Sequence, residues 1–281
     1  MGSLTVVGTG IQAGQLTIAA RNAIREADKL LYFVTNPIAE GYLHSLNSTA
    51  ESLARFYGHE KDRLVTYMEM ADRILDEVGR GLHVCAAFYG HPGIFVISGN
   101  EAIRRARAAG FPARMLPGIS AEDCLFADLG IDPATPGCQN FEATDFLVHR
   151  RQFDIGASLI LWQIGAIGVH DCSPGGYKPR NLDVLAAYLS GFYGPDHNAI
   201  VYEAAALPEL GYRAERISLG ALADAVVTPM STLYVDPKNV PRPADAEMIG
   251  RLGMTAEAVR SLEAKLDIML RAIRTATSRD A

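Results

Sequence analysis

The stretch LHVCAAFYGHPG, from Leu82 to Gly93, shows how the first part of this chain folds. Its first half is a short, mostly apolar run, which is typical of a buried strand. Its second half is a glycine-bounded loop that carries Tyr89, His91 and Pro92. A buried strand that runs directly into such a loop indicates a binding site at the end of the strand.

Two further loops have the same character. One is VVGTGIQAGQ, from Val6 to Gln15, and the other is MLPGISAEDCLF, from Met115 to Phe126. In the latter, Ser120 followed three positions later by Asp123 predicts a helix start with an acidic variant of the capping box. The N–H groups of such a helix start can also donate to a ligand. Together the three loops predict one pocket.

Short apolar runs alternate with helical segments along the chain, which predicts an α/β fold with a parallel first sheet. In the first set we expect strands at Leu4–Val7, Leu30–Val34, Leu82–Ala87 and Ala113–Leu116, and helices at Ala19–Glu26, Val65–Val78 and Ala102–Ala109. In the second set we expect strands at Leu159–Ile164, Ala199–Tyr202 and Thr232–Val235, and helices at Leu182–Ser190 and Leu219–Ala225. The turn-rich PATPG at Pro133–Gly137 separates the sets, so we predict subdomains at residues 1–137 and 138–238.

Residues 239–281 read as a linker and a helical extension. Pro237, Pro241 and Pro243 cannot continue a sheet. From Ala256 a heptad-like apolar stripe follows, made of Val259, Leu262, Leu266, Met269 and Ile273. Such a helix either packs back on its own domain or docks a second subunit or a peptide partner.

Composition and charge exclude several classes of function. The 281 residues are 49% hydrophobic and 21% charged, with a net charge of −6 and no basic run, so nucleic acid is not expected as a partner. Cys85, Cys124, Cys138 and Cys172 lack C-x-x-C spacing, so we expect reduced thiols and no metal site. Neither a long apolar span nor a signal peptide is present, which indicates a cytoplasmic protein without a membrane partner.

The first glycine loop differs from a dinucleotide fingerprint. Gly8, Gly10 and Gly14 follow a strand, but the third glycine is one position late. A ribose-binding carboxylate is also missing, since Thr35 and Asn36 follow the second strand. A nucleotide-binding oxidoreductase is therefore disfavoured, and the glycines alone are equally consistent with a tight strand-to-helix turn.

The loops together resemble a known family. GTGI at Gly8–Ile11, FYGHPG at Phe88–Gly93 and MLPGISAEDCLFADL at Met115–Leu129 are similar, in order and spacing, to the tetrapyrrole-methylase-like S-adenosylmethionine (SAM) methyltransferases. More closely they resemble the borosin-type peptide backbone α-N-methyltransferases. The similarity extends over residues 3–238 and includes LILWQIG at Leu159–Gly165. It implies a class III fold of two α/β subdomains with SAM in the cleft between them, plus a C-terminal helical extension.

The resemblance also implies which residues contact SAM. They are strand-end or turn residues: Tyr89, His91, Ile94, Phe95, Ser120, Ala121, Gln163, Tyr202, Glu203, Ala204, Ser231 and Thr232. His91 need only donate or accept a hydrogen bond, and a loop histidine satisfied by local backbone is the alternative.

The segment ARFYGHEKDRLVTYMEM supplies Tyr57, Arg63 and Tyr67, which match the family's catalytic tyrosines and arginine. An amide nitrogen is a poor nucleophile because its lone pair is delocalised into the carbonyl. Arg63 would stabilise negative charge on the carbonyl oxygen, and Tyr67 or Tyr57 would accept the proton. Ala54 stands where the family often has a further tyrosine, so the identity of the base stays open. Aromatic packing at a helix start is the alternative role.

The implied activity is SAM-dependent α-N-methylation of backbone amides in a ribosomally made precursor peptide. Because the tail ends in the polar RTATSRDA, the chain resembles the split form, which acts on a separate precursor. A homodimer, and a heterotetramer with the precursor, are likewise implied. The alternatives are a tetrapyrrole (precorrin or porphyrin) C-methyltransferase and a non-catalytic peptide-binding assembly module.

Overall fold

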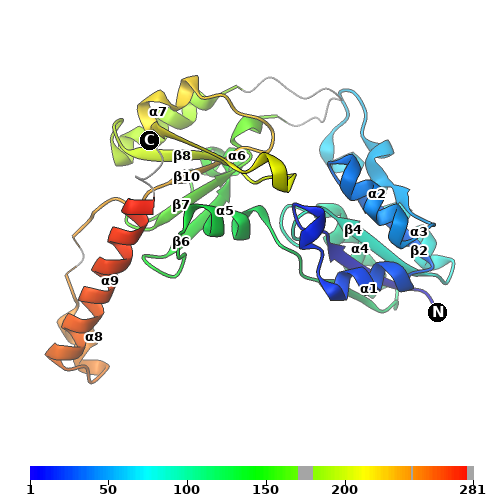
Figure 1. The fold of residues 1–281 in the computed structure, drawn as a ribbon, viewed down its shortest axis with the longest axis horizontal. Coiled ribbons are helices and arrows are strands. Elements are labelled where there is room, and N and C mark those ends of the chain that lie inside the picture. The colour runs from blue at the N-terminus through cyan, green and yellow to red at the C-terminus, as the bar shows by residue number, and fades with distance from the viewer. Residues whose placement is uncertain (170–179, 242, 277–281) are drawn as a thin grey trace. The chain divides into compact units, whose positions relative to one another are not determined.

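The computed structural model describes residues 1–169, 180–241 and 243–276, the last five of these as helix backbone alone. Cys172 and the side chain of Ile273 lie outside the described residues. The chain forms two compact units (Figure 1). Unit 1 consists of Met1–Cys124, Val169–Tyr177 and Ala204–Tyr212, and unit 2 of Leu125–Gly168, Lys178–Glu203 and Arg213–Ala281. The predicted subdomain boundary after Gly137 stays a prediction.

Unit 1 contains a parallel five-stranded sheet in the order β3-β2-β4-β1-β5. Its strands are β1 (Ser3–Gly8), β2 (Lys29–Phe33), β3 (Glu51–Ser52), β4 (His83–Phe88) and β5 (Ala113–Leu116). The connecting helices are α1 (Ile18–Glu26), α2 (Pro37–Leu46), α3 (Arg63–Gly79) and α4 (Ile97–Ala108). The four predicted strands and three predicted helices are confirmed, and β3 and α2 are additions.

Helices cover both faces of this sheet (Figure 1), and each face has its own apolar core. Under α3 and α4 the strands contribute Leu4, Val6, Leu31, Val84, Ala86 and Phe88. Under α1 and α2 they contribute Val7, Leu30, Tyr32, Cys85 and Ala87. Because both faces are buried, these strands are continuously apolar, which is why the sequence revealed them. Burial raises the pKa of the Cys85 thiol to about 12, so this cysteine packs as a small apolar group.

Unit 2 contains a mixed five-stranded sheet in the order β6-β7-β10-β8-β9. Its strands are β6 (Cys138–Glu142), β7 (Ser158–Trp162), β8 (Asn198–Glu203), β9 (Arg213–Ser218) and β10 (Thr232–Val235). Only β6 and β7 are parallel. The predicted strands β7, β8 and β10 are the central ones, whereas the edge strands β6 and β9 are polar in sequence and escaped prediction.

One apolar core joins this second sheet to helices α6 (Ala143–Val148) and α7 (Leu182–Tyr193). The helix predicted at Leu219–Ala225 is a 3₁₀ helix, η5 (Leu219–Asp224), which buries Leu219 and Leu222 in the same core. Helix α5 (Ala121–Leu129) begins at the predicted capping box.

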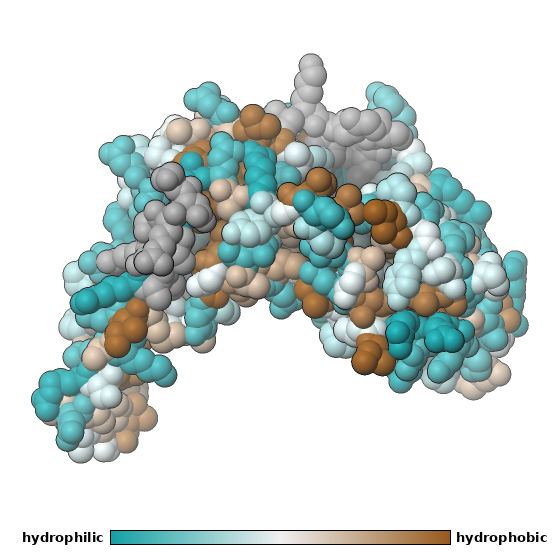
Figure 2. Space-filling view, viewed as in Figure 1, coloured by the Kyte–Doolittle hydropathy of each residue, from teal (hydrophilic) through white to brown (hydrophobic). Residues whose placement is uncertain are grey.

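The C-terminal segment forms α8 (Ala246–Arg251) and α9 (Ala256–Ala276), so the predicted terminal helix is confirmed. Its apolar stripe is partly exposed: 48% of Leu262 and 37% of Leu266 face solvent. Figure 2 shows apolar residues interspersed with polar ones on this extension. Among the described residues, no helix is long and apolar enough to cross a membrane.

The carboxyl ends of β1, β4 and β5 are joined by direct backbone contact. Gly10 and Gly90 exchange two main-chain hydrogen bonds, with Gly90 N 2.8 Å from Gly10 O and Gly10 N 3.3 Å from Gly90 O. A Cβ added at Gly8 would lie 2.3 Å from Gly90 O and 2.9 Å from Gly118 Cα. The three loops that the sequence singled out therefore meet at glycines, because a side chain at Gly8 or Gly118 would push them apart.

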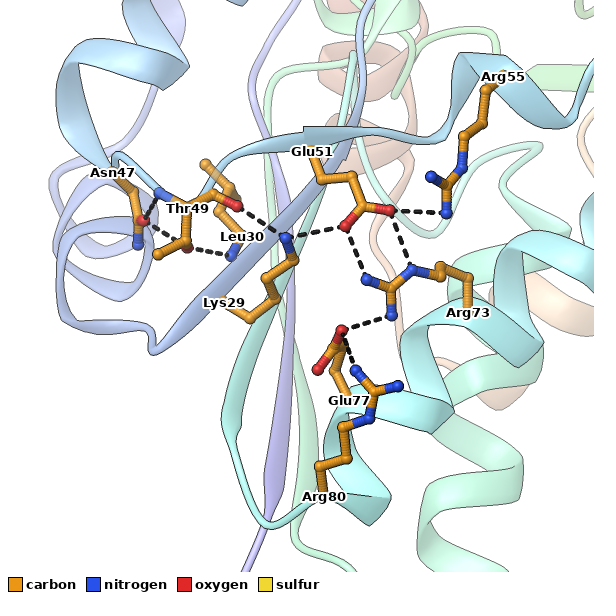
Figure 3. Close-up of polar contacts among 9 residues, drawn as sticks. All are labelled: Lys29, Leu30, Asn47, Thr49, Glu51, Arg55, Arg73, Glu77 and Arg80. Atoms are coloured by element: carbon orange, nitrogen blue, oxygen red, sulfur yellow. Dashed lines mark hydrogen bonds and ion pairs between the residues drawn. The ribbon is translucent and has the colours of Figure 1, made fainter.

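A polar network fixes the other edge of the same sheet (Figure 3). Glu51 on β3 accepts two hydrogen bonds from Arg73 on α3, at 2.9 and 2.7 Å, and pairs with Lys29 and Arg55 at 2.8 Å each. Arg73 also reaches Glu77 at 2.6 Å. The network ties the edge strand to α3, just before the segment that carries Tyr57.

The charges of this network lower the pKa of both carboxylates. Hydrogen bonds from Arg73, with further help from Lys29, lower the pKa of Glu51 to about 2 despite its partial burial. Burial raises the pKa of Glu77, but Arg73 and Arg80 outweigh this effect and hold it below its ordinary value. Both groups are therefore ionised in the folded protein at neutral pH.

The depressed pKa of Glu51 predicts acid sensitivity. The ionised carboxylate stabilises the folded state above its unfolded pKa of about 4.5, and this contribution is lost as pH falls toward about 2. We expect Glu51→Gln to lower the free energy of unfolding at pH 7 by about 2–3 kcal/mol, a difference that shrinks below pH ~4.5. Urea unfolding of both proteins across this pH range measures it. Glu60→Gln, at a carboxylate that is 82% exposed, is the control and should change little. A Glu51→Gln protein as stable as wild type at pH 7 would contradict the role of the network.

The glycine contact predicts that Gly8→Ala destabilises unit 1. The added Cβ would force the Gly8 and Gly90 loops apart, and overpacking of this kind costs about 1–3 kcal/mol. Gly14→Ala is the matched control, because a Cβ there would meet no heavy atom within 4 Å in the described part of the chain. Thermal unfolding should show a lower midpoint for Gly8→Ala alone. Equal midpoints for the two variants would refute the close approach.

Candidate active site

The loop after β4 carries four of the predicted cofactor contacts. His91 Nδ1 accepts a hydrogen bond from Gly93 N at 3.0 Å, so in the neutral ring Nε2 is the donor. Ile94 is 37% exposed and Phe95 is 48% exposed. Phe95 has a positive φ of 55°, a left-handed conformation that is uncommon outside glycine. The loop therefore presents a polar donor beside two exposed apolar side chains.

The third loop has the predicted helix start. Ser120 Oγ accepts from Asp123 N at 3.1 Å, while Asp123 Oδ2 accepts from Ser120 N at 2.7 Å. This reciprocal pair confirms the acidic capping box. Ser120 is nearly buried, and Ala121 is the first residue of α5. The remaining N–H groups of this first turn are hydrogen-bond donors, as at any helix start.

Aromatic rings connect the second loop to the predicted catalytic segment. Phe33, the last residue of β2, lies with its ring centroid 5.1 Å from that of Tyr57 and 6.0 Å from that of Tyr89. Tyr89 N also donates to Phe33 O at 3.1 Å. The structure thus brings Tyr57 and Tyr89 to one strand end, although they are distant in sequence.

Arg63 and Tyr67 lie on α3, which begins at Arg63, two residues before the predicted start at Val65. Asp62 caps the helix by accepting from Leu64 N at 2.6 Å, and Arg63 is the first helical residue. Tyr67 follows four residues later, so both side chains share one face of the helix. Tyr57 and Tyr67 are partly buried against the core of unit 1. Both tyrosines therefore have the aromatic packing role that the sequence left as the alternative.

Lys61 is a residue of this segment that the sequence did not single out. Its Nζ donates to Phe56 O at 2.8 Å and pairs with Glu69 on α3. These bonds fold the loop between Tyr57 and Arg63 back onto the helix. A lysine in a polar loop carries no sequence signal for such a role.

In unit 2 the predicted contacts gather around the end of β7. Gln163 follows this strand directly, in a left-handed conformation with φ 59° and ψ 37°. Ser231 and Thr232, at the start of β10, are buried. Ser231 O accepts a hydrogen bond from Ile164 N at 3.2 Å, so these strand ends are joined.

Tyr202 and Glu203, at the end of β8, have side chains engaged within unit 2. Tyr202 is fully buried, and its hydroxyl donates to Asp128 Oδ2 at 2.7 Å. Glu203 Oε1 accepts from Thr228 Oγ1 at 2.9 Å and from Ser231 Oγ. Asp128 and Thr228 were missed by the sequence, because only the fold shows which polar groups they meet.

Ala204 begins the short segment that belongs to unit 1. The next residue, Ala205, accepts a hydrogen bond at its main-chain oxygen from Gln12 Nε2, at 3.0 Å. Gln12 lies in the first glycine loop, where Gln15 Oε1 accepts from Ile11 N at 2.7 Å and from Gln12 N at 3.0 Å. The first loop is therefore ordered by its own glutamines.

Comparison with known proteins places this arrangement in a family. Residues 3–225 match the model of the Tetrapyrrole (Corrin/Porphyrin) Methylases. The chain is 42% identical over 260 residues to the methyltransferase and cyclic peptide gymnopeptides precursor of Gymnopus fusipes, covering 91% of this chain and 62% of that protein. It is 40% identical over 242 residues to the methyltransferase and omphalotin A precursor of Omphalotus olearius, covering 84% and 58%. The chain thus spans about 60% of the length of these curated relatives.

Solved structures agree on the fold. Uroporphyrin-III-C-methyltransferase from Thermus thermophilus superposes with a TM-score of 0.60 at 17% identity, over 84% of this chain and 92% of that one. Cobalt precorrin-4 methyltransferase gives 0.59 at 15% identity, over 83% and 94%. The matched family model, with a fold that agrees, leads to one conclusion: the chain belongs to the tetrapyrrole methylase family of methyltransferases and is similar, within it, to proteins of the borosin type.

Proposed function

We propose that this enzyme transfers methyl groups from SAM to backbone amide nitrogens of a ribosomally made precursor peptide, supplied as a separate chain. The observation that carries the proposal is the similarity, over most of this chain, to proteins named as both methyltransferase and cyclic peptide precursor. Intact-mass spectrometry distinguishes supply of the precursor in trans from automethylation.

The chemistry requires activation of the amide. Its nitrogen lone pair is delocalised into the carbonyl, so the nitrogen becomes nucleophilic only as the N–H proton leaves and charge develops on oxygen. In the proposal the Arg63 guanidinium donates to that oxygen, and Tyr67 or Tyr57 accepts the proton. A tyrosine base requires a cation that favours its phenolate form, and in the proposal Arg63 supplies that cation.

The position of Arg63 supports this role. A cation at the first residue of a helix opposes the helix dipole, at a cost of about 0.3–1 kcal/mol. Residues that break a local rule of this kind concentrate at functional sites. The ring of Tyr57 packs against the ring of Phe33. Phe33 also packs against Tyr89 of the predicted cofactor loop. The predicted base and a predicted cofactor contact are thus neighbours within unit 1.

The residues present fit SAM. The first turn of α5 suits the carboxylate of its methionine part, and His91 Nε2 is a donor for its ribose or carboxylate oxygens. Ile94 and Phe95 provide apolar surface for the adenine ring. From unit 2 we propose Gln163, Ser231, Thr232 and the main chain of Tyr202 to Ala204. When bound, SAM supplies an electrophilic methyl group on a sulfonium.

We further propose a homodimer and, with bound precursor, a heterotetramer. The partly exposed apolar stripe of α9 supports docking of a second subunit or of a precursor helix, since Leu262 and Leu266 present it to solvent. The oligomeric state is measurable by light scattering.

Intact-mass spectrometry tests the reaction. The chain is incubated with SAM and a synthetic peptide copied from the precursor segment of the Gymnopus fusipes relative, with the chain alone as control. We expect mass steps of one methyl group on the peptide, localised by fragmentation to backbone nitrogens. Steps on the chain itself would replace trans supply with automethylation. Binding of SAM without methylation of either would favour a tetrapyrrole acceptor, which a porphyrinoid absorbance shift would reveal.

The catalytic assignment predicts the effect of single substitutions. Arg63→Gln removes the charge at the carbonyl oxygen, and Tyr67→Phe and Tyr57→Phe each remove one hydroxyl. We expect Arg63→Gln and whichever tyrosine variant removes the base to lower the methylation rate about 100-fold or more.

Tyr42→Phe is the control, because Tyr42 lies on α2, which packs on the opposite face of the sheet through Leu43. Single-turnover rates measure all four variants. Near-normal rates in both Tyr57→Phe and Tyr67→Phe would rule out a tyrosine base.

A further inference from the structure

The turn after β7 is strained in a way that needs support from its surroundings. Gln163 adopts a left-handed conformation, which is unfavourable for a residue with a side chain. Strained residues of this kind persist only where neighbouring structure determines them, and they concentrate at ligand sites.

The segment Thr228–Ser231 is pressed against it. Ile164 N donates to Ser231 O at 3.2 Å. A Cβ added at Gly165 would lie only 2.0 Å from Thr228 O, so the two main chains are in direct contact. Displacing one segment must displace the other.

Glu203 in turn organises Thr228–Ser231. Its Oε1 accepts from both hydroxyls of the segment, with Thr228 Oγ1 at 2.9 Å. Each hydroxyl also accepts a main-chain N–H: Ser231 Oγ from Thr228 N at 2.7 Å, and Thr228 Oγ1 from Met230 N at 3.1 Å. The carboxylate thereby orients two hydroxyls that fold the segment around themselves.

Arg213, the first residue of β9, completes the arrangement. Its Nη1 lies 3.3 Å from Glu203 Oε1, and its Nη2 donates to Val226 O at 2.6 Å and pairs with Glu215. The side chains of Glu203 and Arg213 are only 21% and 31% exposed. A charge-assisted network of this kind is stronger than neutral hydrogen bonds.

We infer that Thr228 and Arg213 are positioning residues for the cofactor: acting through the Glu203 carboxylate, they hold Thr228–Ser231 and hence the strained Gln163 turn in the binding geometry. The inference rests on the proposed function, since it takes SAM as the ligand. It assigns the Glu203 side chain to this network rather than to contact with the cofactor. Neither Thr228 nor Arg213 need touch the reacting atoms.

Isothermal titration of the folded full-length chain with SAM and with S-adenosylhomocysteine tests this inference. Thr228→Val keeps the shape of the side chain but removes both hydrogen bonds of its hydroxyl. We expect roughly tenfold weaker binding of both ligands, as for loss of a hydrogen bond to a charged group. Thr228→Ser keeps the hydroxyl and should bind within about twofold of wild type. In turnover, KM for SAM should rise in Thr228→Val while kcat changes little.

Thr255→Val is the matched control. It removes a hydroxyl that accepts from Ala258 N at 3.2 Å, at the start of α9 and outside the network. We expect wild-type affinity for SAM. Thermal unfolding of every variant separates a loss of folding from a loss of affinity.

Glu203→Gln gives a second, independent reading, because it keeps the size of the side chain and removes its charge. It should weaken SAM binding in the same direction as Thr228→Val, and it decides the matter if Thr228→Val does not fold. Wild-type affinity in folded Thr228→Val or Glu203→Gln, even with a lowered melting temperature, would overturn the positioning role alone. Failure of the wild-type chain to bind SAM would overturn the proposed cofactor as well.

Discussion

Direct backbone contact between strand-end loops is the constraint on which unit 1 depends. Gly8 and Gly118 lie so close to Gly90 that a methyl group added at either of them would collide with the Gly90 carbonyl oxygen. The loops that follow the carboxyl ends of parallel strands lie at one edge of the sheet. Glycine permits this close approach, so the loop with His91 and the helix start at Ser120 are set by one contact. The polar groups offered to a ligand there are consequently main-chain groups and short loop side chains.

Unit 2 reaches a comparable result by different means. Its strand ends are joined by hydrogen bonds around one carboxylate, Glu203, which gathers two hydroxyls and a guanidinium. Gly165, in the turn after β7, adds one close backbone approach, because a Cβ there would lie 2.0 Å from Thr228 O. Glycine packing does not depend on salt concentration, whereas salt screens the interactions between charged groups in a network. The strand-end loops of unit 1 and those of unit 2 are therefore held by forces of different character.

The site residues differ in how far sequence could assign them. The capping box of Ser120 and Asp123 was predictable because both partners lie within one helical turn. The neighbourhood of Tyr57 and Tyr89 was not, since it passes through Phe33 on a third segment. Asp128 and Thr228 were missed for the same reason: each bonds to a partner far along the chain. Sequence likewise placed Tyr202 among the cofactor contacts without revealing that its hydroxyl is committed to Asp128.

The parallel sheet of unit 1, the three glycine loops, the terminal helix and the family could be predicted from the sequence, because they depend on local pattern and on motifs of fixed spacing. Buried central strands are continuously apolar, and so they stand out. The edge strands β6 and β9, the 3₁₀ form of Leu219–Asp224 and the left-handed turn at Gln163 were decided only by the tertiary structure. In each case the local preference is weak or unfavourable, and contacts with distant segments provide the free energy that selects the conformation.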